Sequence, residues 1–187
     1  MKKMLFAAAL GAVCAQAAAA ETYVIDPTHT YPMFEISHLG FSTTRGGFNK
    51  TDGKIVLDRA NKTGTVEITI DANSLTTPVQ KLDEHLKNED FFDVAKYPTI
   101  SFKADRLVFD GDRLAAVPGE LTMHGVTRPV TLTVTHFVCK EHPMLRKPHC
   151  GADAEATIRR SDWGISAYSP AVGEEVKLKI QVEATRQ

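Results

Sequence analysis

Side chains that could bind a soft metal ion gather in one short stretch of the 187-residue chain, between Cys139 and Cys150. His142, Met144 and His149 lie inside the same stretch. Thiolate, imidazole and thioether groups in this combination suit copper or zinc, so one hypothesis is a redox or metal-binding protein that uses this loop. The other interpretation is a hairpin loop closed by a disulfide bond between the two cysteines, with no metal bound.

Residue types typical of nucleophilic catalysis are present, but they form no recognisable motif. Asp26, His29 and Ser37 could supply the members of a catalytic triad, yet nothing in their spacing brings them together. The seven histidines are scattered, without the spacing of a helical metal-binding pair. The sequence also lacks the nucleophile-elbow, zinc-protease and phosphate-loop motifs. We therefore predict no catalytic residue, no resident metal, no catalytic cofactor and no enzymatic activity.

The first twenty residues predict export from the cytoplasm. Lys2 and Lys3 precede an alanine-rich apolar stretch, and Ala18–Ala20 supply the small residues of a cleavage site. Residues 1–20 are therefore interpreted as a signal peptide, with residues 21–187 as a single periplasmic domain. The apolar stretch is too short to span a membrane well, so no stable membrane insertion is expected. Export makes a disulfide between Cys139 and Cys150 the first prediction, because the compartment is oxidising.

The charge balance argues against a nucleic-acid partner. The chain has 22 Lys and Arg residues against 23 Asp and Glu residues, and cleavage of the signal peptide would remove two of the lysines. Phosphate binding needs clustered basic residues, which a weakly acidic domain does not supply. The oligomeric state, monomer or homodimer, is left open by the composition.

Alternating apolar and polar residues predict β-strands along most of the chain. The clearest examples are residues 65–71, 130–135 and 176–184, in which valine, leucine, isoleucine or alanine occupies every second position. Turn sequences such as Asp52-Gly53, Asp110-Gly111 and His124-Gly125 separate such stretches at short intervals. Strands in hairpin order without intervening helices indicate an antiparallel sandwich or barrel.

One segment has the pattern of a helix, predicted at about residues 78–90. Thr77 would be the N-cap, Pro78 the first helical residue and Gln80 the partner that completes a capping box. Leu82 and Leu86 follow at helical spacing. A single apolar-faced helix in an all-β protein is expected to close one end of a barrel.

The distribution of apolar side chains suits a hollow barrel. A closed barrel of about eight strands has an interior that side chains fill or that holds one small ligand. The inward positions are mostly aliphatic, whereas Phe41, Phe48, Phe91 and Phe92 lie near the expected strand ends and helix. Such a tube with aromatic ends would select a long hydrocarbon. The alternative is a structural domain with a filled interior, in which the phenylalanines only anchor turns and Trp163 belongs to the core.

Short motifs along residues 23–176 together resemble the YceI family of exported polyisoprenoid-binding proteins. They are Tyr23-Val24-Ile25-Asp26 with His29, Phe34 to Gly40, Gly47-Phe48, Asp83 to Lys87, Asp90 to Asp93, Lys96-Tyr97-Pro98, Gly119 to Val130, Trp163-Gly164 and Gly173 to Val176. The resemblance implies an all-β fold, an antiparallel eight-stranded lipocalin-like barrel with one short capping helix. It also implies a long internal pore that holds a polyisoprenoid, a ubiquinone-like quinone or another apolar lipid.

The leading hypothesis is therefore a periplasmic protein that sequesters or carries such a lipid. The residues predicted to form the wall and gate of the pore share an apolar side chain, and His38 is added as a hydrogen-bond partner for a head group. The wall and gate residues are Phe34, Ile36, Phe41, Phe48, Leu86, Phe91, Phe92, Phe102, Leu121, Leu132, Val134 and Trp163.

Overall fold

The computed structural model describes residues 20–187, so the predicted signal peptide lies outside the described residues except for Ala20. The strands are β1 (Glu21–Ile25), β2 (Tyr31–His38), β3 (Ser42–Phe48), β4 (Thr51–Asp58), β5 (Thr63–Asp71), β6 (Leu75–Thr76), β7 (Thr99–Ala104), β8 (Val108–Asp110), β9 (Arg113–Met123), β10 (Val126–Glu141), β11 (Pro148–Arg159) and β12 (Val172–Arg186). One α-helix, α1 (Gln80–Lys87), and two 3-10 turns, Ala72–Ser74 and Arg160–Trp163, complete the elements. Within this part of the chain, no helix is both long and apolar enough to cross a membrane.

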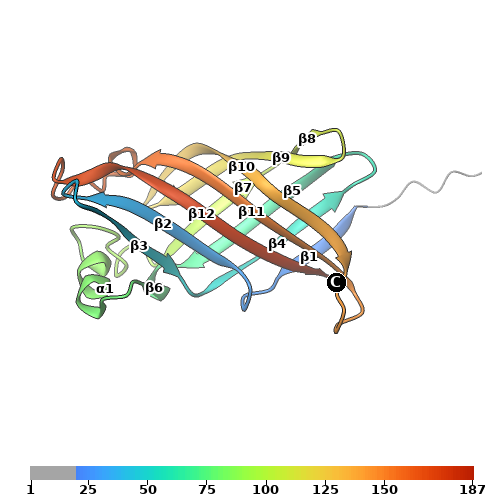
Figure 1. Cartoon of the computed structure of the whole chain (residues 1–187), viewed down its shortest axis with the longest axis horizontal. Helices are drawn as coiled ribbons and strands as arrows, with labels where there is room; N and C mark the ends of the chain where they lie inside the picture. The colour runs from blue at the N-terminus through green and yellow to red at the C-terminus, as the bar shows by residue number, and fades with distance from the viewer. Residues whose placement is uncertain (1–19) are drawn as a thin grey trace, which may run out of the picture.

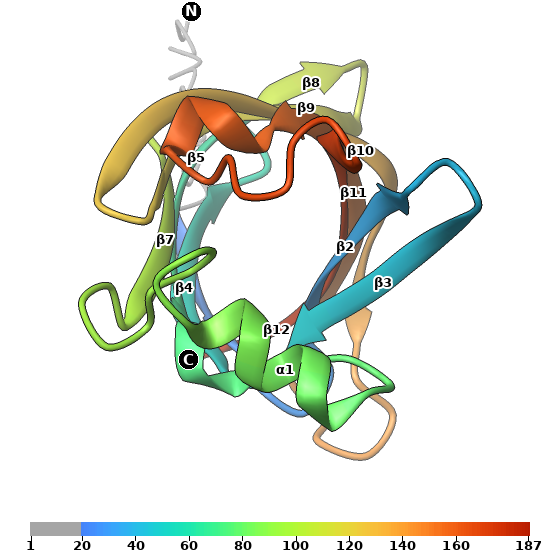
Figure 2. The same ribbon diagram turned by 90° about the vertical axis from the view of Figure 1, so that its left-hand side faces the viewer.

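Eight strands close into an antiparallel barrel, as predicted. The order of hydrogen-bonded neighbours is β1-β4-β5-β7-β9-β10-β11-β12, and β12 pairs back with β1. Figure 1 shows the long strands running obliquely around the barrel, and Figure 2 looks into its end. Closure gives every barrel strand a hydrogen-bonded neighbour on both sides, so none of these strands is left as a free edge.

β1 and β2 both pair with β12, at different positions along its length. The strands that follow β2 lie at the end of the barrel that carries α1. β12 pairs with β1 through residues 184–186 and with β2 through residues 172–181. β2 then pairs with β3, and β3 with the short β6. β2, β3 and β6 thus form a branch of the sheet outside the closed ring of eight strands. The helix α1 lies across the same end of the barrel (Figure 2). The expectation of a helix at one end is confirmed.

The helix is shorter than predicted and begins two residues later. Val79 is the N-cap, and the helix ends at Lys87 rather than near Asp90. Thr77 does accept a hydrogen bond, but from the N–H of Val79, and the carboxylate of Asp83 accepts the N–H of Thr77. Asp83 therefore takes the capping role predicted for Gln80. Because the carboxylate of Asp83 accepts the N–H of Thr77, residues 77–79 form a turn before the helix.

Two glycines allow aromatic rings to pack closely against neighbouring strands. A Cβ atom at Gly46 would lie 2.5 Å from the ring of Phe34, and one at Gly119 would lie 2.6 Å from the ring of Phe102. No side chain could be accommodated at either position without moving the ring or the backbone. Gly46 and Gly119 therefore place Phe34 and Phe102 against the wall, where they face the interior.

Cys139 and Cys150 form a disulfide bond, as predicted. They face each other directly across the β10–β11 ladder, which ends in a loop of residues 142–147. Both sulfur atoms are therefore committed to each other, and neither is available as a thiolate ligand for a metal.

Removing the disulfide is expected to destabilise the β10–β11 hairpin. A bridge between residues 11 apart restricts the unfolded chain, so replacing Cys139 and Cys150 by serine should lower the free energy of unfolding by about 2–3 kcal/mol. Urea denaturation of the oxidised protein and the double variant measures this difference. Addition of a reductant should destabilise the unmodified protein and leave the double variant unchanged. Equal stability of the two oxidised proteins would contradict the prediction.

Candidate ligand-binding cavity

The barrel encloses a cavity of about 620 Å³ whose wall is formed mainly by aliphatic and aromatic side chains. The wall comes from strands distant in sequence, including β2, β5, β10 and β12, and from α1. Alternation along each strand directs every second side chain inward, so the hairpins bring their apolar faces to one interior. The interior is thus hollow, which argues against the alternative of a filled structural domain.

Ten of the thirteen residues predicted to bind a ligand line this cavity. They are Phe34, Ile36, His38, Phe48, Leu86, Phe91, Phe92, Phe102, Leu121 and Leu132. Val134 lies beyond them, in the wall of a second cavity of about 110 Å³. The two cavities share five wall residues, Pro32, Ile68, Phe102, Leu132 and Ile180, which separate them.

The other two predicted residues do not line either cavity. Phe41 is 89% exposed at the tip of the β2–β3 hairpin, where Leu39 and Gly40 adopt left-handed conformations that complete the turn. The tip projects beyond the barrel, so Phe41 does not close over the opening. Trp163 is 2% exposed, and its indole N–H donates to the carbonyl oxygen of Leu121 at 3.1 Å. Trp163 thus packs behind the cavity wall, as the core interpretation predicted.

Aromatic side chains concentrate at the end of the cavity near α1. The ring centroids of Phe34 and Phe48 are 6.3 Å apart, and those of Phe48 and Phe92 are 5.6 Å apart. Phe91 stacks on Tyr168 with centroids 5.9 Å apart. This cluster combines β2, β3, the segment after α1 and the loop before β12. It gives the cavity the aromatic end that the sequence predicted, although without Phe41.

The polar side chains in the cavity wall lie near this same end. His38 is exposed at the end of β2, and His85 of α1 lies with its Nε2 atom 3.4 Å from the hydroxyl oxygen of Tyr168. All three residues contribute to the wall. The cavity therefore combines a long apolar interior with hydrogen-bonding groups at one end, which suits a molecule with an apolar chain and a polar head.

Arg160 is a buried cation in the same wall. It is 4% exposed, and its guanidinium donates to the carbonyl oxygens of Gly173 at 2.8 Å and of Ile165 and Val172 at 3.1 Å each. Burial lowers the pKa of Arg160, and the nearby carboxylate of Glu174 acts in the opposite direction. The three hydrogen bonds hold the segment 165–173, which brings Tyr168 and Val172 to the cavity.

Some wall residues were missed in the prediction of the site although the sequence contained a signal for them. Val176, Leu178 and Ile180 of β12 line the cavity, and the alternation of residues 176–184 already placed them on one face. Nothing comparable indicates Arg160 or Tyr168. Both belong to an irregular segment, where side-chain direction follows from tertiary contacts rather than from periodicity.

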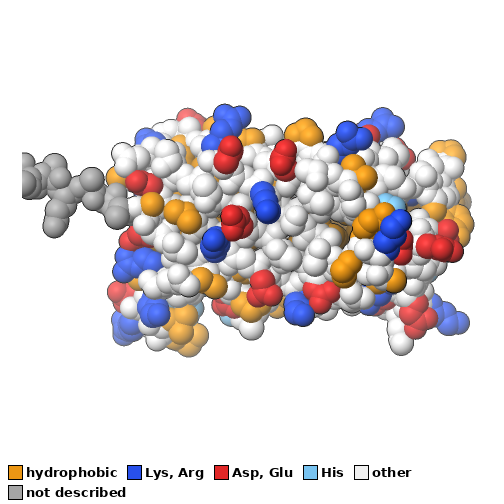
Figure 3. All heavy atoms as spheres, turned by 180° about the vertical axis from the view of Figure 1, so that it is seen from behind, with side chains coloured by type: hydrophobic (Ala, Val, Ile, Leu, Met, Phe, Trp, Pro, Cys, Tyr) orange, Lys and Arg blue, Asp and Glu red, His pale blue; other side chains and the backbone are white. Residues whose placement is uncertain are grey.

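The outside of the barrel carries charges of both signs. Figure 3 shows Lys and Arg side chains interspersed with Asp and Glu over one face, with small apolar patches between them. One pair, Asp26 and His29, lies in the turn between β1 and β2, with Oδ2 of Asp26 2.8 Å from Nδ1 of His29. Burial raises the pKa of Asp26, but hydrogen bonds from Thr28 and His29 outweigh it and bring the pKa to about 2. The hydrogen bond to Asp26 raises the pKa of His29.

The Asp26–His29 pair should contribute to stability only in a defined pH range. The contribution of His29, whose pKa is raised on folding, is complete below about pH 6.5 and is lost as the pH rises through its folded-state pKa. The contribution of Asp26 is present above about pH 3.8 and is lost as the pH falls towards 2. His29→Gln should therefore cost most stability between about pH 4 and 6.5, and less at about pH 9. Urea denaturation of both proteins at pH 5.5 and pH 9 measures the difference.

The control for this experiment is His136→Gln, because His136 is an exposed histidine of β10. Its effect on the free energy of unfolding should not show the same decrease between the two pH values. A cost of His29→Gln that stays constant or increases at pH 9 would contradict the prediction.

Comparison with known proteins agrees with this architecture over most of the chain. The YceI-like domain matches residues 23–184. A UPF0312 protein of Pseudomonas aeruginosa is 36% identical over 193 aligned positions that cover 100% of both chains. Protein YceI of Escherichia coli O157:H7 is 35% identical over 192 positions, again covering 100% of both chains.

Solved structures share the fold. BcnA of Burkholderia cenocepacia superposes with a TM-score of 0.74 at 23% identity, covering 86% of this chain and 99% of that one. A YCEI protein of Campylobacter jejuni gives a TM-score of 0.70 at 26% identity, with 81% and 90% covered. A polyisoprenoid-binding domain of Saccharophagus degradans gives 0.66 at 15% identity, with 88% and 98% covered. With a family match over residues 23–184 and full-length relatives at 35–36% identity, the chain belongs to the YceI-like family.

Proposed function

We propose that this protein binds the hydrocarbon chain of a polyisoprenoid or a ubiquinone-like isoprenoid quinone inside its barrel, and that it carries or sequesters this lipid in the periplasm. The observation on which the proposal depends is the cavity of about 620 Å³ with its apolar wall. The likeness to a Saccharophagus degradans domain described as polyisoprenoid-binding supports the same class of ligand. Binding, rather than catalysis, is the proposed activity.

Burial of apolar surface would supply the affinity. Each CH₂ group removed from water is worth about 0.8 kcal/mol before the costs of association and ordering. After those costs a larger ligand retains about 0.3 kcal/mol per heavy atom. A chain of roughly 40 heavy atoms would then bind with about −12 kcal/mol, which corresponds to a nanomolar dissociation constant. No ion pair between protein and ligand is required.

The arrangement of polar side chains suggests how the ligand lies. His38, His85 and Tyr168 line the wall near the α1 end, whereas Ile68, Leu132 and Ile180 separate the main cavity from the smaller one. We expect the apolar chain to extend toward this partition and the head group to remain near His38. The hydrogen-bonding groups at this end can serve a quinone carbonyl as well as a hydroxyl, so the head group itself is left open.

The periplasmic location is supported by two separate features. Residues 1–20 have the pattern of a signal peptide, and Cys139 and Cys150 form a disulfide bond of the kind that persists in oxidising compartments. A carrier at this location would shield an apolar lipid from water between the sites where it is released and taken up.

The test is to purify the protein without detergent and to identify any bound lipid by organic extraction and mass spectrometry. A co-purified isoprenoid, or saturable 1:1 uptake of added ubiquinone or decaprenol by the lipid-free protein, is the expected result. Absence of co-purified lipid together with no uptake of either compound would contradict the proposed function.

A further inference from the structure

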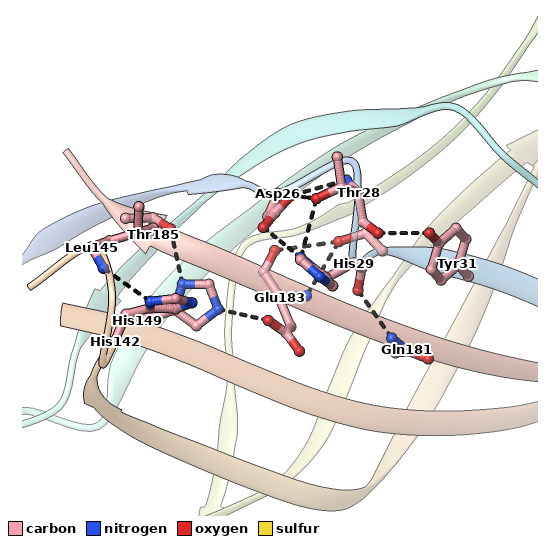
Figure 4. A network of polar contacts seen from close by, with 11 residues as sticks. Asp26, Thr28, His29, Tyr31, His142, Leu145, His149, Gln181, Glu183 and Thr185 are labelled. Carbon is pink, nitrogen blue, oxygen red and sulfur yellow. Dashed lines mark hydrogen bonds and ion pairs between the residues drawn. The ribbon is translucent and has the colours of Figure 1, made fainter. Parts of the chain in front are cut away.

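A cluster of metal-ligating side chains lies on the barrel wall, outside the lipid cavity. Asp26 and His29 come from the turn between β1 and β2, and Glu183 comes from β12. One possible ligand atom from each residue lies within 4.8 Å of the corresponding atoms of the other two. Figure 4 shows Asp26 and His29 joined by a hydrogen bond beside Glu183, whose carboxylate is hydrogen-bonded to His149. Glu183 is more than 150 positions from Asp26 and His29 in the sequence and meets them only because β12 closes the barrel beside β1 and β2.

Backbone hydrogen bonds hold the two segments of the cluster in place. The N–H of Asp26 donates to the carbonyl oxygen of Glu183 at 2.9 Å, and the N–H of Glu183 donates to the hydroxyl oxygen of Thr30 at 3.2 Å. The Thr30 side chain is 2% exposed. These hydrogen bonds connect the turn to the strand at Glu183, so the fold fixes the backbone positions from which the three side chains extend.

A buried histidine orients the Glu183 carboxylate. His149 is 9% exposed, with its Nε2 atom 2.8 Å from Oε2 of Glu183 and its Nδ1 atom 2.8 Å from the hydroxyl oxygen of Thr185. Carboxylates that bind metals are commonly held by such a second hydrogen-bonded group. His149 is one of the soft ligands of the Cys139–Cys150 stretch, and its ring lies edge-on to that of His142, with centroids 5.0 Å apart, but both of its ring nitrogens are engaged with Glu183 and Thr185.

The other candidates in the disulfide loop are committed elsewhere. Cys139 and Cys150 are bonded to each other. The Nδ1 atom of His142 accepts the N–H groups of Met144 and Leu145 at 3.2 and 3.1 Å, so a neutral His142 carries its proton on Nε2. The loop therefore does not provide the thiolate and imidazole site considered from the sequence.

The charges of the cluster suit a cation. Asp26 and Glu183 place two carboxylates beside the imidazole of His29, with Oδ2 of Asp26 2.8 Å from Nδ1 of His29. A divalent ion could take the position between these two carboxylates and bind the neutral imidazole. Imidazole nitrogen and carboxylate oxygen are both ligand types that zinc accepts, three such ligands leave a fourth position for water, and manganese accepts the same set.

We propose that Asp26, His29 and Glu183 bind one divalent transition-metal ion, with Zn²⁺ as the best match, and that His149 is a positioning residue for Glu183. The site lies outside the lipid cavity, so the proposal does not depend on the proposed function. Metal at this position would connect the β1–β2 turn to β12, at the seam where the barrel closes.

The test is calorimetric titration of ZnCl₂ into the full exported chain, lipid-free and treated with EDTA. The expected result is one ion per protein with a micromolar dissociation constant. His29→Gln and Glu183→Gln should each weaken binding at least tenfold. His149→Gln should weaken it about tenfold while the stoichiometry stays at one, because the change removes an orienting group and no ligand. His136→Gln, at an exposed histidine of β10, is the matched control and should bind like the unmodified protein.

Thermal unfolding provides a second readout that also shows whether each variant is folded. Saturating Zn²⁺ should raise the Tm of the unmodified protein and of His136→Gln, because the ion binds the folded state, and should not raise the Tm of Glu183→Gln. No saturable binding at 100 μM ZnCl₂ would overturn the proposal. It would also be overturned if the folded variants His29→Gln and Glu183→Gln bound Zn²⁺ as tightly as the unmodified protein, or if His136→Gln weakened binding as much as they do.

Discussion

Replacement of Arg160 by methionine is expected to lower the free energy of unfolding by about 3–5 kcal/mol, because it leaves buried carbonyl groups without donors. The guanidinium of Arg160 supplies hydrogen bonds to three carbonyl oxygens, of Ile165, Val172 and Gly173, and the side chain is 4% exposed. Methionine preserves most of the apolar stem of the side chain, so the loss reports mainly on the hydrogen bonds. Urea denaturation is the measurement.

The neighbouring residue provides a matched control for this change. Arg159 is exposed at the end of β11, so Arg159→Met should alter the free energy of unfolding by about 0.5 kcal/mol or less. Arg160→Lys should fall between the two, because an ammonium group keeps the charge but cannot reach three carbonyls in the fork geometry of arginine. A loss below about 1 kcal/mol for Arg160→Met would show that water or backbone rearrangement replaces the missing donors.

The second large effect is expected for Leu132→Trp, which should weaken binding of ubiquinone or decaprenol at least a hundredfold, or about 2.7 kcal/mol. Leu132 belongs to the partition between the two cavities, so an indole ring at this position would occupy space that the chain of the ligand needs. Binding is measured by titrating the lipid-free protein with either compound. This change tests whether the ligand enters the barrel rather than attaching to its surface.

The adjacent position on the same strand separates occlusion from other effects of a new tryptophan. Thr133 of β10 is exposed on the outer face, so Thr133→Trp should bind the lipid like the unmodified protein. Because the cavity offers room for the larger ring, Leu132→Trp should cost no more than about 1–3 kcal/mol of stability. If folded Leu132→Trp bound the lipid with unchanged affinity, the internal site would be ruled out.

The strands of this protein could be predicted from local sequence because their period depends on local geometry. Val130, Leu132 and Val134 alternate with threonines, and in a strand such residues must point to opposite faces. All three face one of the two cavities. The helix limits were less accurate, since both Gln80 and Asp83 can complete a cap and their competition is decided by the geometry of the turn at Thr77.

The site could be predicted where it lies on regular strands and could not where it depends on irregular segments. Phe34, Phe102 and Leu121 have directions set by strand alternation, and they line the cavity as predicted. Phe41 has the same apolar character, but it lies at a hairpin tip, where no periodicity indicates whether a side chain turns inward. Trp163 likewise belongs to a 3-10 turn, and its hydrogen bond to Leu121 keeps it in the core.

The sequence by itself determined an all-β chain with an alternating apolar face and a resemblance to the YceI family, and it made a disulfide between Cys139 and Cys150 the first prediction. These features depend on residue type and on spacings of two or a few residues. Only the tertiary structure decided that the interior is hollow, that Arg160 holds the segment before β12 and that Glu183 meets Asp26 and His29. The physical reason is barrel closure, because the pairing of β12 with β1 and β2 brings together residues whose separation in the chain carries no local signal.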